Sequence, residues 1–153
     1  MSRRIPTNYD GESVMNVLKL SYLTTSIMRL ENLLRTLSVE TPTRTTIRQL
    51  YTFASIAKFN AEGKLVTLTE VKQRAGDHLG EPVLGPHVNR SYQIFLSPEE
   101  ARDTEALGWI SRQTNPNDRR ESFIMLTPKG REIITQFSEM MGGANGMETE
   151  EKA

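Results

Sequence analysis

The side chains with the clearest chemical capacity lie in the segment 87–96, where hydrogen-bonding groups follow one another closely. They are His87, Asn89, Arg90, Ser91, Tyr92 and Gln93. Arginine pairs in a fork with the edge of guanine, and asparagine and glutamine pair with the edge of adenine. We interpret these residues as candidates for reading DNA bases, with Tyr92 contacting a thymine methyl group or a phosphate. The alternative is a half-exposed helix whose apolar residues pack inward, namely Val88, Ile94, Phe95 and Leu96.

A second group of basic residues surrounds the turn-forming sequence Asn115-Pro116-Asn117-Asp118. Arg119 and Arg120 at such a turn can reach into a minor groove, where narrow A-tract DNA concentrates negative potential. Asp118 is expected to hold one of these arginines by a charge-assisted bond and to shape the turn. Arg112 adds a base on the preceding strand. The alternative is a solvated hairpin with a surface ion pair, which contributes little to stability.

Other kinds of site have little support in the sequence. There is no cysteine, and the two histidines, His78 and His87, accompany Asp77 and Glu81 in a stretch rich in glycine and proline, with no recognisable metal-ligand spacing. No nucleophile stands beside a base in a known pattern, and no glycine-rich phosphate loop occurs. We therefore expect a protein that is not an enzyme and that needs neither a metal nor another cofactor.

Length and composition suit one globular domain, because the chain has 153 residues of which 37% are hydrophobic and 25% charged. No apolar run is long enough to span a membrane and no secretory signal pattern opens the chain, so we expect a cytoplasmic protein. The net charge of zero argues against nucleic-acid binding. The distribution is uneven, however: Trp109–Arg131 holds five bases and two acids, whereas Glu139–Ala153 holds four acids and one base. A local basic patch matters more for phosphate binding than the total.

The basic turn lies between two segments that favour β-structure. Trp109 and Ile110 precede it, and the apolar run Phe123–Leu126 follows it. Thr127 is then suited to cap a helix, with Pro128 at the first helical position, where its missing N–H costs nothing. The sequence therefore predicts a β-hairpin with a basic tip between two helices, which is a winged helix in outline.

Helical patterns open and close the predicted domain, which we place at 13–141. The first, 13–37, begins at a candidate cap, Ser13, and carries an apolar stripe: Leu20, Leu23, Ile27, Leu30, Leu34 and Leu37. The last, 128–141, has an apolar side with Ile133, Ile134 and Phe137. The stripe packs either within the monomer or along a dimer seam, and we expect a mixture of both. Residues 1–12 are expected to be a flexible arm, and 142–153 a disordered acidic tail.

Between these ends, the pattern predicts a helix over 45–60, a short strand at Leu65–Val66 pairing with the hairpin, and a helix over 70–75 capped by Thr69. The stretch 76–86 contains three glycines and two prolines and is expected to interrupt the helical structure. A helix over 87–96 and a further segment at 99–107 follow, separated by Ser97-Pro98.

The hairpin residues also resemble the wing of the MarR (multiple antibiotic resistance regulator) family. Leu107-Gly108-Trp109-Ile110 is similar to the family's apolar-Gly-apolar-Ile approach to the wing. Asp118 and Arg120 match its Asp-x-Arg tip, and the stretch from Leu126 to Gly130 matches its Leu-Thr-x-x-Gly exit. The resemblance is specific over these two dozen residues, and elsewhere it extends only to the order of elements.

The resemblance implies a mainly α, winged helix-turn-helix regulator of transcription that binds double-stranded DNA as a homodimer. It implies that 87–96 is the recognition helix, that Arg120 enters the minor groove, and that helices 13–37 and 128–141 form the dimer. The dimerisation residues are then Leu20, Leu23, Ile27, Leu30, Leu34, Ile133, Ile134 and Phe137. The absence of cysteine excludes the cysteine-sensing mode of some such regulators, and any other small-molecule or protein effector stays open.

Two features depart from the family pattern. The stretch 76–86 is longer than the three or four residues that join a compact helix-turn-helix, and Ser97-Pro98 interrupts what is often one helix. Together with the neutral net charge, these departures keep a second hypothesis open. It is a winged-helix interaction module that binds a polymerase, a replication protein or another regulator without reading DNA.

Overall fold

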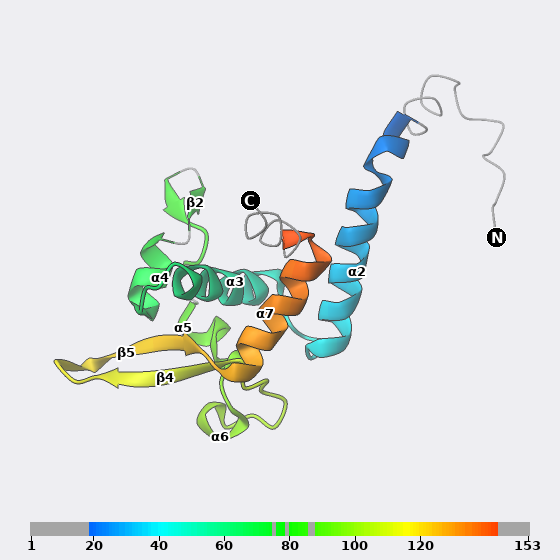
Figure 1. The fold of residues 1–153 in the computed structure, drawn as a ribbon. Helices are drawn as coiled ribbons and strands as arrows, with labels where there is room; N and C mark the ends of the chain where they lie inside the picture. The colour runs from blue at the N-terminus through cyan, green and yellow to red at the C-terminus, as the bar shows by residue number, and fades with distance from the viewer. Residues whose placement is uncertain (1–18, 75, 79, 86–87, 144–153) are drawn as a thin grey trace, which may run out of the picture.

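The computed structural model describes residues 19–74, 76–78, 80–85 and 88–143, and its fold is mainly helical (Figure 1). The helical elements are η1 (Lys19–Leu23), α2 (Thr24–Glu40), α3 (Ile47–Ala61), α4 (Leu68–Arg74), α5 (Val88–Ser91), η2 (Gln93–Phe95), α6 (Pro98–Ala101) and α7 (Pro128–Met140). The strands are β1 (Val66–Thr67), β2 (Asp77–His78), β3 (Glu81–Pro82), β4 (Ile110–Asn115) and β5 (Asp118–Leu126). β1, β5 and β4 form a three-stranded antiparallel sheet in that order. This confirms the predicted winged-helix fold class.

Aromatic rings hold the centre of the fold together. Phe53 of α3 stacks on Phe95 at a centroid distance of 5.1 Å and meets the Trp109 ring at 5.0 Å. Phe137 of α7 meets the edge of Trp109 at 6.4 Å. All four side chains are buried. Because aromatic rings bury large apolar areas, this cluster joins α3, η2, the approach to β4 and α7 into one core.

Capping residues set where the helices begin. α3 starts behind a capping box, in which the Thr46 hydroxyl accepts from the Gln49 N–H and the Gln49 side chain accepts from the Thr46 N–H. The predicted cap of the next helix was wrong, because the N–H of Glu70 donates to Thr67 rather than to Thr69. The helix therefore begins directly after β1, which pairs with β5 as expected.

The first helical region runs through η1 and α2, and its predicted start at Ser13 lies outside the described residues. It extends three residues beyond Leu37, and Thr41 then ends it by donating both its N–H and its hydroxyl to the Leu37 carbonyl. α2 contains no buried residue and stands away from the sheet, although its lower part packs against α7 (Figure 1). Most of its apolar stripe is therefore uncovered in the single chain.

The wing forms as the sequence predicts. β4 and β5 pair antiparallel, with a register shift at Thr114/Asn115 and the turn between Asn115 and Asp118. The Asn115 side chain accepts from the Asn117 N–H at 2.9 Å, which fixes the turn locally. At the far end of β5, Thr127 caps α7 by accepting from the Gly130 N–H, and Pro128 takes the first helical position.

Within the stretch 76–86, β2 and β3 form an additional hairpin that was not predicted from the sequence. β2 pairs antiparallel with β3, and Gly76 and Gly80 take positive φ angles of 123° and 83°. The Val83 N–H donates to the Gly76 carbonyl, and Leu84 is buried in the core. The insertion is therefore a short hairpin whose two ends are held together and packed onto the core, rather than a lengthened turn.

The prediction of one helix over 87–96 was wrong. α5 makes one turn, Tyr92 follows, and η2 completes the segment. The N–H groups of Phe95 and Leu96 donate to carbonyls three residues back, those of Tyr92 and Gln93, at 3.0 and 3.1 Å, so the second half of the segment closes as a 3-10 turn. The carbonyls of residues 94–96 accept from the N–H groups of residues 107–109 at 2.7–2.8 Å, so the helix does not run on past Leu96. The following segment is helical only in α6, and Arg102 at its end adopts a left-handed conformation with φ 52°.

Candidate nucleic-acid interface

The outer wing, residues 112–121, projects from the body of the protein (Figure 1). Every residue in it except Asn115 is exposed, including Arg119 and Arg120 at the tip. The inner part of the hairpin contributes to the core, since Ile110 and Ile124 are buried. The outer part adds almost no buried surface, so its length is not explained by the stability of the fold.

Asp118 acts on the backbone of the tip rather than on an arginine side chain. Its Oδ1 accepts from the Arg120 N–H at 3.0 Å. Within the part of the chain that the structure describes, the ion pairs are Arg44 with Asp103 and Glu105, and Lys64 with Glu62. The expected charge-assisted bond from Asp118 to an arginine side chain is therefore absent from this arrangement, whereas its expected role in shaping the turn is confirmed.

The reading segment, residues 88–96, turns two of its polar side chains to the surface. Arg90 and Gln93 are exposed, while Ser91 is half-buried. His87 lies outside the described residues, and for Asn89 only the backbone position in α5 is described. The predicted inward packing is confirmed for Ile94, Phe95 and Leu96, which are buried.

Tyr92 joins the reading segment to the wing. Tyr92 belongs to the core and is 6% exposed, which argues against the predicted contact with a thymine methyl group, whereas the alternative, a phosphate contact, stays a prediction. The Tyr92 hydroxyl accepts from Nη1 of Arg112 on β4 at 3.1 Å. These two residues, Arg120 and the hydroxyl-bearing Thr67 and Thr69 border one cleft of about 270 Å³. No sequence signal pointed to Thr67 or Thr69 as site residues.

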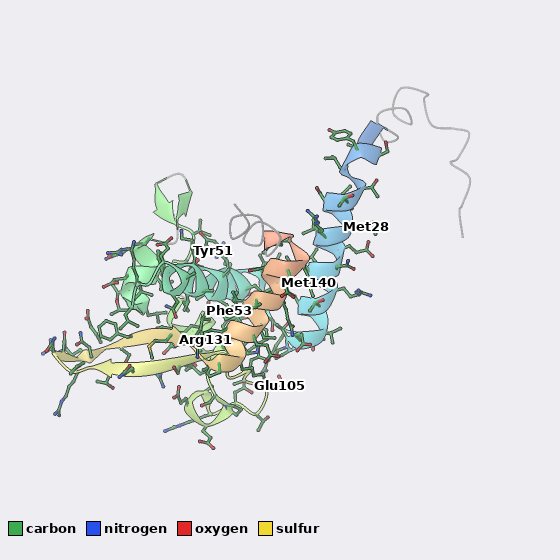
Figure 2. All side chains as sticks on the ribbon, viewed as in Figure 1. Met28, Tyr51, Phe53, Glu105, Arg131 and Met140 are labelled. Carbon is green, nitrogen blue, oxygen red and sulfur yellow. The ribbon has the colours of Figure 1, made fainter. Side chains whose placement is uncertain are left out.

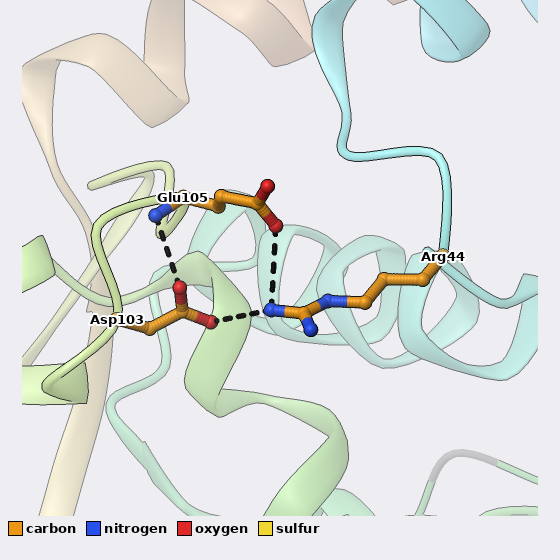
Figure 3. Close-up of polar contacts among 3 residues, drawn as sticks. All are labelled: Arg44, Asp103 and Glu105. Carbon is orange, nitrogen blue, oxygen red and sulfur yellow. Dashed lines mark hydrogen bonds and ion pairs between the residues drawn. The ribbon is translucent and has the colours of Figure 1, made fainter.

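A second cleft, of about 250 Å³, lies on the other side of the reading segment and brings Arg44 beside Arg90 and Gln93. Arg44 bonds Asp103 at 3.2 Å and Glu105 at 3.3 Å, and Asp103 also accepts from the Glu105 N–H (Figure 3). Exposed ion pairs of this kind contribute little to stability. No sequence signal identified Arg44, because its partners are about 60 residues away along the chain.

The predicted dimerisation residues fall into two groups. Leu20, Ile27, Leu30 and Leu34 on the first helical region are 46–55% exposed, and Leu23 is half-buried. On α7, Ile133 and Phe137 are buried in the core of the same chain, which corrects their assignment to a partner-facing surface. Ile134, also on α7, is half-buried and packs against the core. Of the two groups, only the stripe on η1 and α2 is open, at Leu20, Ile27, Leu30 and Leu34.

The described residues lack two other kinds of site. They contain no group of three or more histidine, cysteine, aspartate or glutamate side chains arranged to hold a metal ion. None of their helices combines the length and the apolar character needed to cross a bilayer.

Comparisons with known proteins return solved structures only. No family model and no curated protein matches the chain. A mutant of MarR from E. coli is 21% identical over 99% of this chain and 88% of that chain, with a TM-score of 0.47. YusO from Bacillus subtilis is 18% identical over 93% and 83%, with a TM-score of 0.46. Sco3205, a MarR family transcriptional regulator from Streptomyces coelicolor solved in complex with DNA, is 18% identical over 96% and 78%, with a TM-score of 0.43.

Proposed function

We propose that this chain is a DNA-binding regulator of transcription that acts in the cytoplasm as a homodimer. The reading segment enters the major groove, and the outer wing approaches the neighbouring minor groove. The observation that carries the proposal is the Arg112–Tyr92 hydrogen bond, which joins the root of the wing to the reading segment. The cleft that these two residues border also holds Arg120, so basic side chains of the wing lie beside the reading segment.

The chemistry of the exposed groups supports a nucleic-acid partner. Arg119 and Arg120 are exposed at the tip and make no ion pair within the described chain. Phosphate contacts position a protein on DNA, while contacts to base edges give specificity. The wing supplies the first kind of group, and Arg90 and Gln93 of the reading segment supply the second.

The open stripe on α2 supports the dimer. Leu20, Ile27 and Leu34 repeat every seven residues, and Leu23, Leu30 and Leu37 follow the same period three residues later. This is the spacing of a seam between two helices. Leu20, Ile27, Leu30 and Leu34 of this seam are about half exposed, so they are available to a second copy. Two copies would read a roughly palindromic site with half-sites about one helical turn apart.

The direct test is a mobility-shift selection from pooled genomic fragments at low salt, followed by titration of the recovered duplexes. We expect a recurring palindromic site that binds more tightly than a scrambled duplex of the same length. The proposal fails if no duplex is bound above background at low salt.

One observation favours a second function. The reading segment has only one α-helical turn before it becomes a 3-10 turn, so it offers a short surface to a groove. A winged-helix interaction module without sequence-specific DNA reading is consistent with this geometry. A stoichiometric protein partner recovered from nuclease-treated lysate, together with no duplex binding, would favour this function.

The substitution Arg120→Ala is expected to weaken binding to all duplexes and to reduce the slope of log affinity against log salt by about 1, since one fewer counterion is released. The turn survives the change, because it is the backbone N–H of Arg120 that bonds Asp118. Fluorescence anisotropy at several salt concentrations measures the effect. Arg35→Ala, at an exposed arginine on α2, is the matched control and should leave the slope unchanged.

The substitution Arg90→Ala is expected to act on specificity. It should cost about 1–3 kcal/mol on the selected site and relax discrimination at one position per half-site. The measurement is a titration against the selected and the scrambled duplex under the same conditions. An equal loss on both duplexes would identify Arg90 as a phosphate contact and contradict its assignment to base reading.

A further inference from the structure

Arg44 is a basic residue of the reading segment's second cleft that belongs to neither the segment nor the wing. It lies in the corner between α2 and α3, and it borders this cleft together with Arg90 and Gln93. Its side chain is 69% exposed. A duplex that presents base edges to Arg90 and Gln93 therefore brings its phosphates into the neighbourhood of Arg44 as well.

Two carboxylates neutralise Arg44. Asp103 and Glu105 belong to the loop between α6 and β4, where Figure 2 places Glu105. Both bond the same guanidinium nitrogen, Nη2, at 3.2 Å from Oδ2 of Asp103 and 3.3 Å from Oε2 of Glu105 (Figure 3). These three side chains, which we call the Arg44 cluster, carry one positive and two negative charges. The cluster is therefore net negative, beside a segment that is proposed to bind a polyanion.

The Arg44 cluster is not needed to hold its loop in place. The backbone does so, because the Asp103 N–H donates to the Pro98 carbonyl at 3.2 Å and the Asp103 carbonyl accepts from the Ala106 N–H at 3.1 Å. The side chains of the two acids are 33% and 58% exposed, and ion pairs as exposed as these contribute little to stability. The pairing of two acids with one base is thus not explained by the fold.

The guanidinium of Arg44 is able to exchange its partners. A guanidinium carries five N–H donors, and both bonds in the cluster use Nη2, so Nη1 and Nε keep donors for a further acceptor. The planar fork of an arginine suits two oxygens of a phosphate. A phosphate placed close to Arg44 therefore competes with the exposed carboxylates, whereas a phosphate that stays farther away meets the net negative charge of the cluster.

We infer that Asp103 and Glu105 are specificity-determining residues, which neutralise Arg44 until the reading segment is seated on its site. On a cognate duplex, the base contacts of Arg90 and Gln93 bring a phosphate close enough for Arg44 to leave the carboxylates. On other duplexes the segment stays loosely bound, Arg44 remains paired, and the two acids repel the backbone. A cost built into binding the wrong partner is a general route to specificity. The inference rests on the proposed function and adds residues outside the reading segment and the wing.

The double substitution Asp103→Asn and Glu105→Gln removes both negative charges and keeps the size of the side chains. An amide oxygen in place of Oδ1 of Asp103 can still accept from the backbone N–H of residue 105, so the turn is retained. Affinity for the scrambled duplex should rise about tenfold, and its dependence on log salt should steepen by about 1, because Arg44 then releases one more counterion. On the selected duplex the gain should be about threefold or less, since Arg44 already contacts a phosphate there.

The matched control is Glu99→Gln with Glu100→Gln. It changes the net charge by the same amount, at two exposed acids of α6 that do not border the cleft. The ratio of the two affinities should stay that of the unaltered chain. Arg44→Gln added to the first double variant should reverse the gain on the scrambled duplex. In the otherwise unaltered chain, Arg44→Gln should weaken the selected duplex about tenfold and leave the scrambled duplex nearly unchanged.

Fluorescence anisotropy titrations of both duplexes at several salt concentrations measure these effects, with far-UV circular dichroism to verify that each variant is folded. The inference is overturned if removing the two acids leaves the affinity ratio unchanged, or if the control lowers the ratio as much. It is also overturned if Arg44→Gln leaves the gain on the scrambled duplex in place. An unaltered chain that binds no duplex defeats the proposed function and this inference together, whereas duplex binding with an unchanged ratio defeats the inference alone.

Discussion

The substitution Gly130→Ala is expected to destabilise the protein by at least about 3 kcal/mol, at the upper end of the cost of overpacking a core. A Cβ at this position would lie 1.9 Å from the Trp109 carbonyl oxygen and 2.9 Å from the carbonyl carbon. These are backbone atoms, so a change of rotamer cannot relieve the overlap. This is between about a fifth and three fifths of the roughly 5–15 kcal/mol that stabilises a typical domain.

The surrounding hydrogen bonds prevent the two segments from separating easily. The Thr127 N–H donates to the Trp109 carbonyl at 3.0 Å, and the Thr127 hydroxyl donates to the Gly108 carbonyl at 2.7 Å. The Trp109 N–H donates to the Phe95 carbonyl at 2.7 Å. Moving α7 outward to accommodate a methyl group would therefore stretch the hydrogen bonds from Thr127 to the carbonyls of Gly108 and Trp109. It would also strain the bond that holds the Trp109 backbone beside Phe95.

Urea unfolding measures this prediction, with far-UV circular dichroism followed alongside the fluorescence of Trp109, the single, buried tryptophan. Gly85→Ala is the control, since a Cβ there meets nothing within 4 Å. Its stability should stay within about 1 kcal/mol of the unaltered protein. Equal unfolding midpoints for the two variants would show that α7 can move away from Trp109 at little cost.

The double substitution Ile27→Asp and Leu30→Asp is expected to abolish the proposed dimer, raising its dissociation constant by about 1,000-fold or more because charges would be buried in the seam. The fold of the single chain should persist, since both side chains are about half exposed in it. Binding to a duplex with two half-sites should fall with the loss of the second reading segment.

Sedimentation equilibrium at micromolar concentration tests the dimer directly. Val39→Asp is a matched control, because Val39 is 78% exposed on α2 but lies on the side of the helix away from the stripe. This variant should remain dimeric. A monomer for the unaltered protein would contradict the dimer, and a dimer that survives the double substitution would place its interface elsewhere.

The sequence determined the wing because its signals are local. The turn residues Asn115–Asp118, the cap at Thr127 and the proline after it act on neighbouring backbone groups, so their effect does not depend on distant partners. The resemblance to the MarR wing rests on the same residues. The helix 45–60 was likewise predicted to within two residues of α3 from its apolar periodicity, and the capping box of Thr46 and Gln49 sets its start in the structure.

Only the tertiary structure decided the form of the reading segment. Its polar and apolar residues fit a helix over 87–96, yet its second half is a 3-10 turn whose last three carbonyls, those of residues 94–96, bond residues 107–109. Those bonds seat Phe95 between Phe53 and Trp109, and the burial of these rings outweighs helical propensity over a few residues. Propensity is a weak local term, whereas packing depends on residues that meet only in the folded chain.

The same distinction explains the candidate sites. Exposed polar residues such as Arg90 and Arg120 are recognisable from their types and positions in the chain. The burial of Tyr92, its bond to Arg112, and the burial of Ile133 and Phe137 in the monomer each depend on contacts between distant segments. The periodicity of the sequence predicts on which side of a helix an apolar residue lies. It does not predict whether that side packs against the same chain or against a second copy.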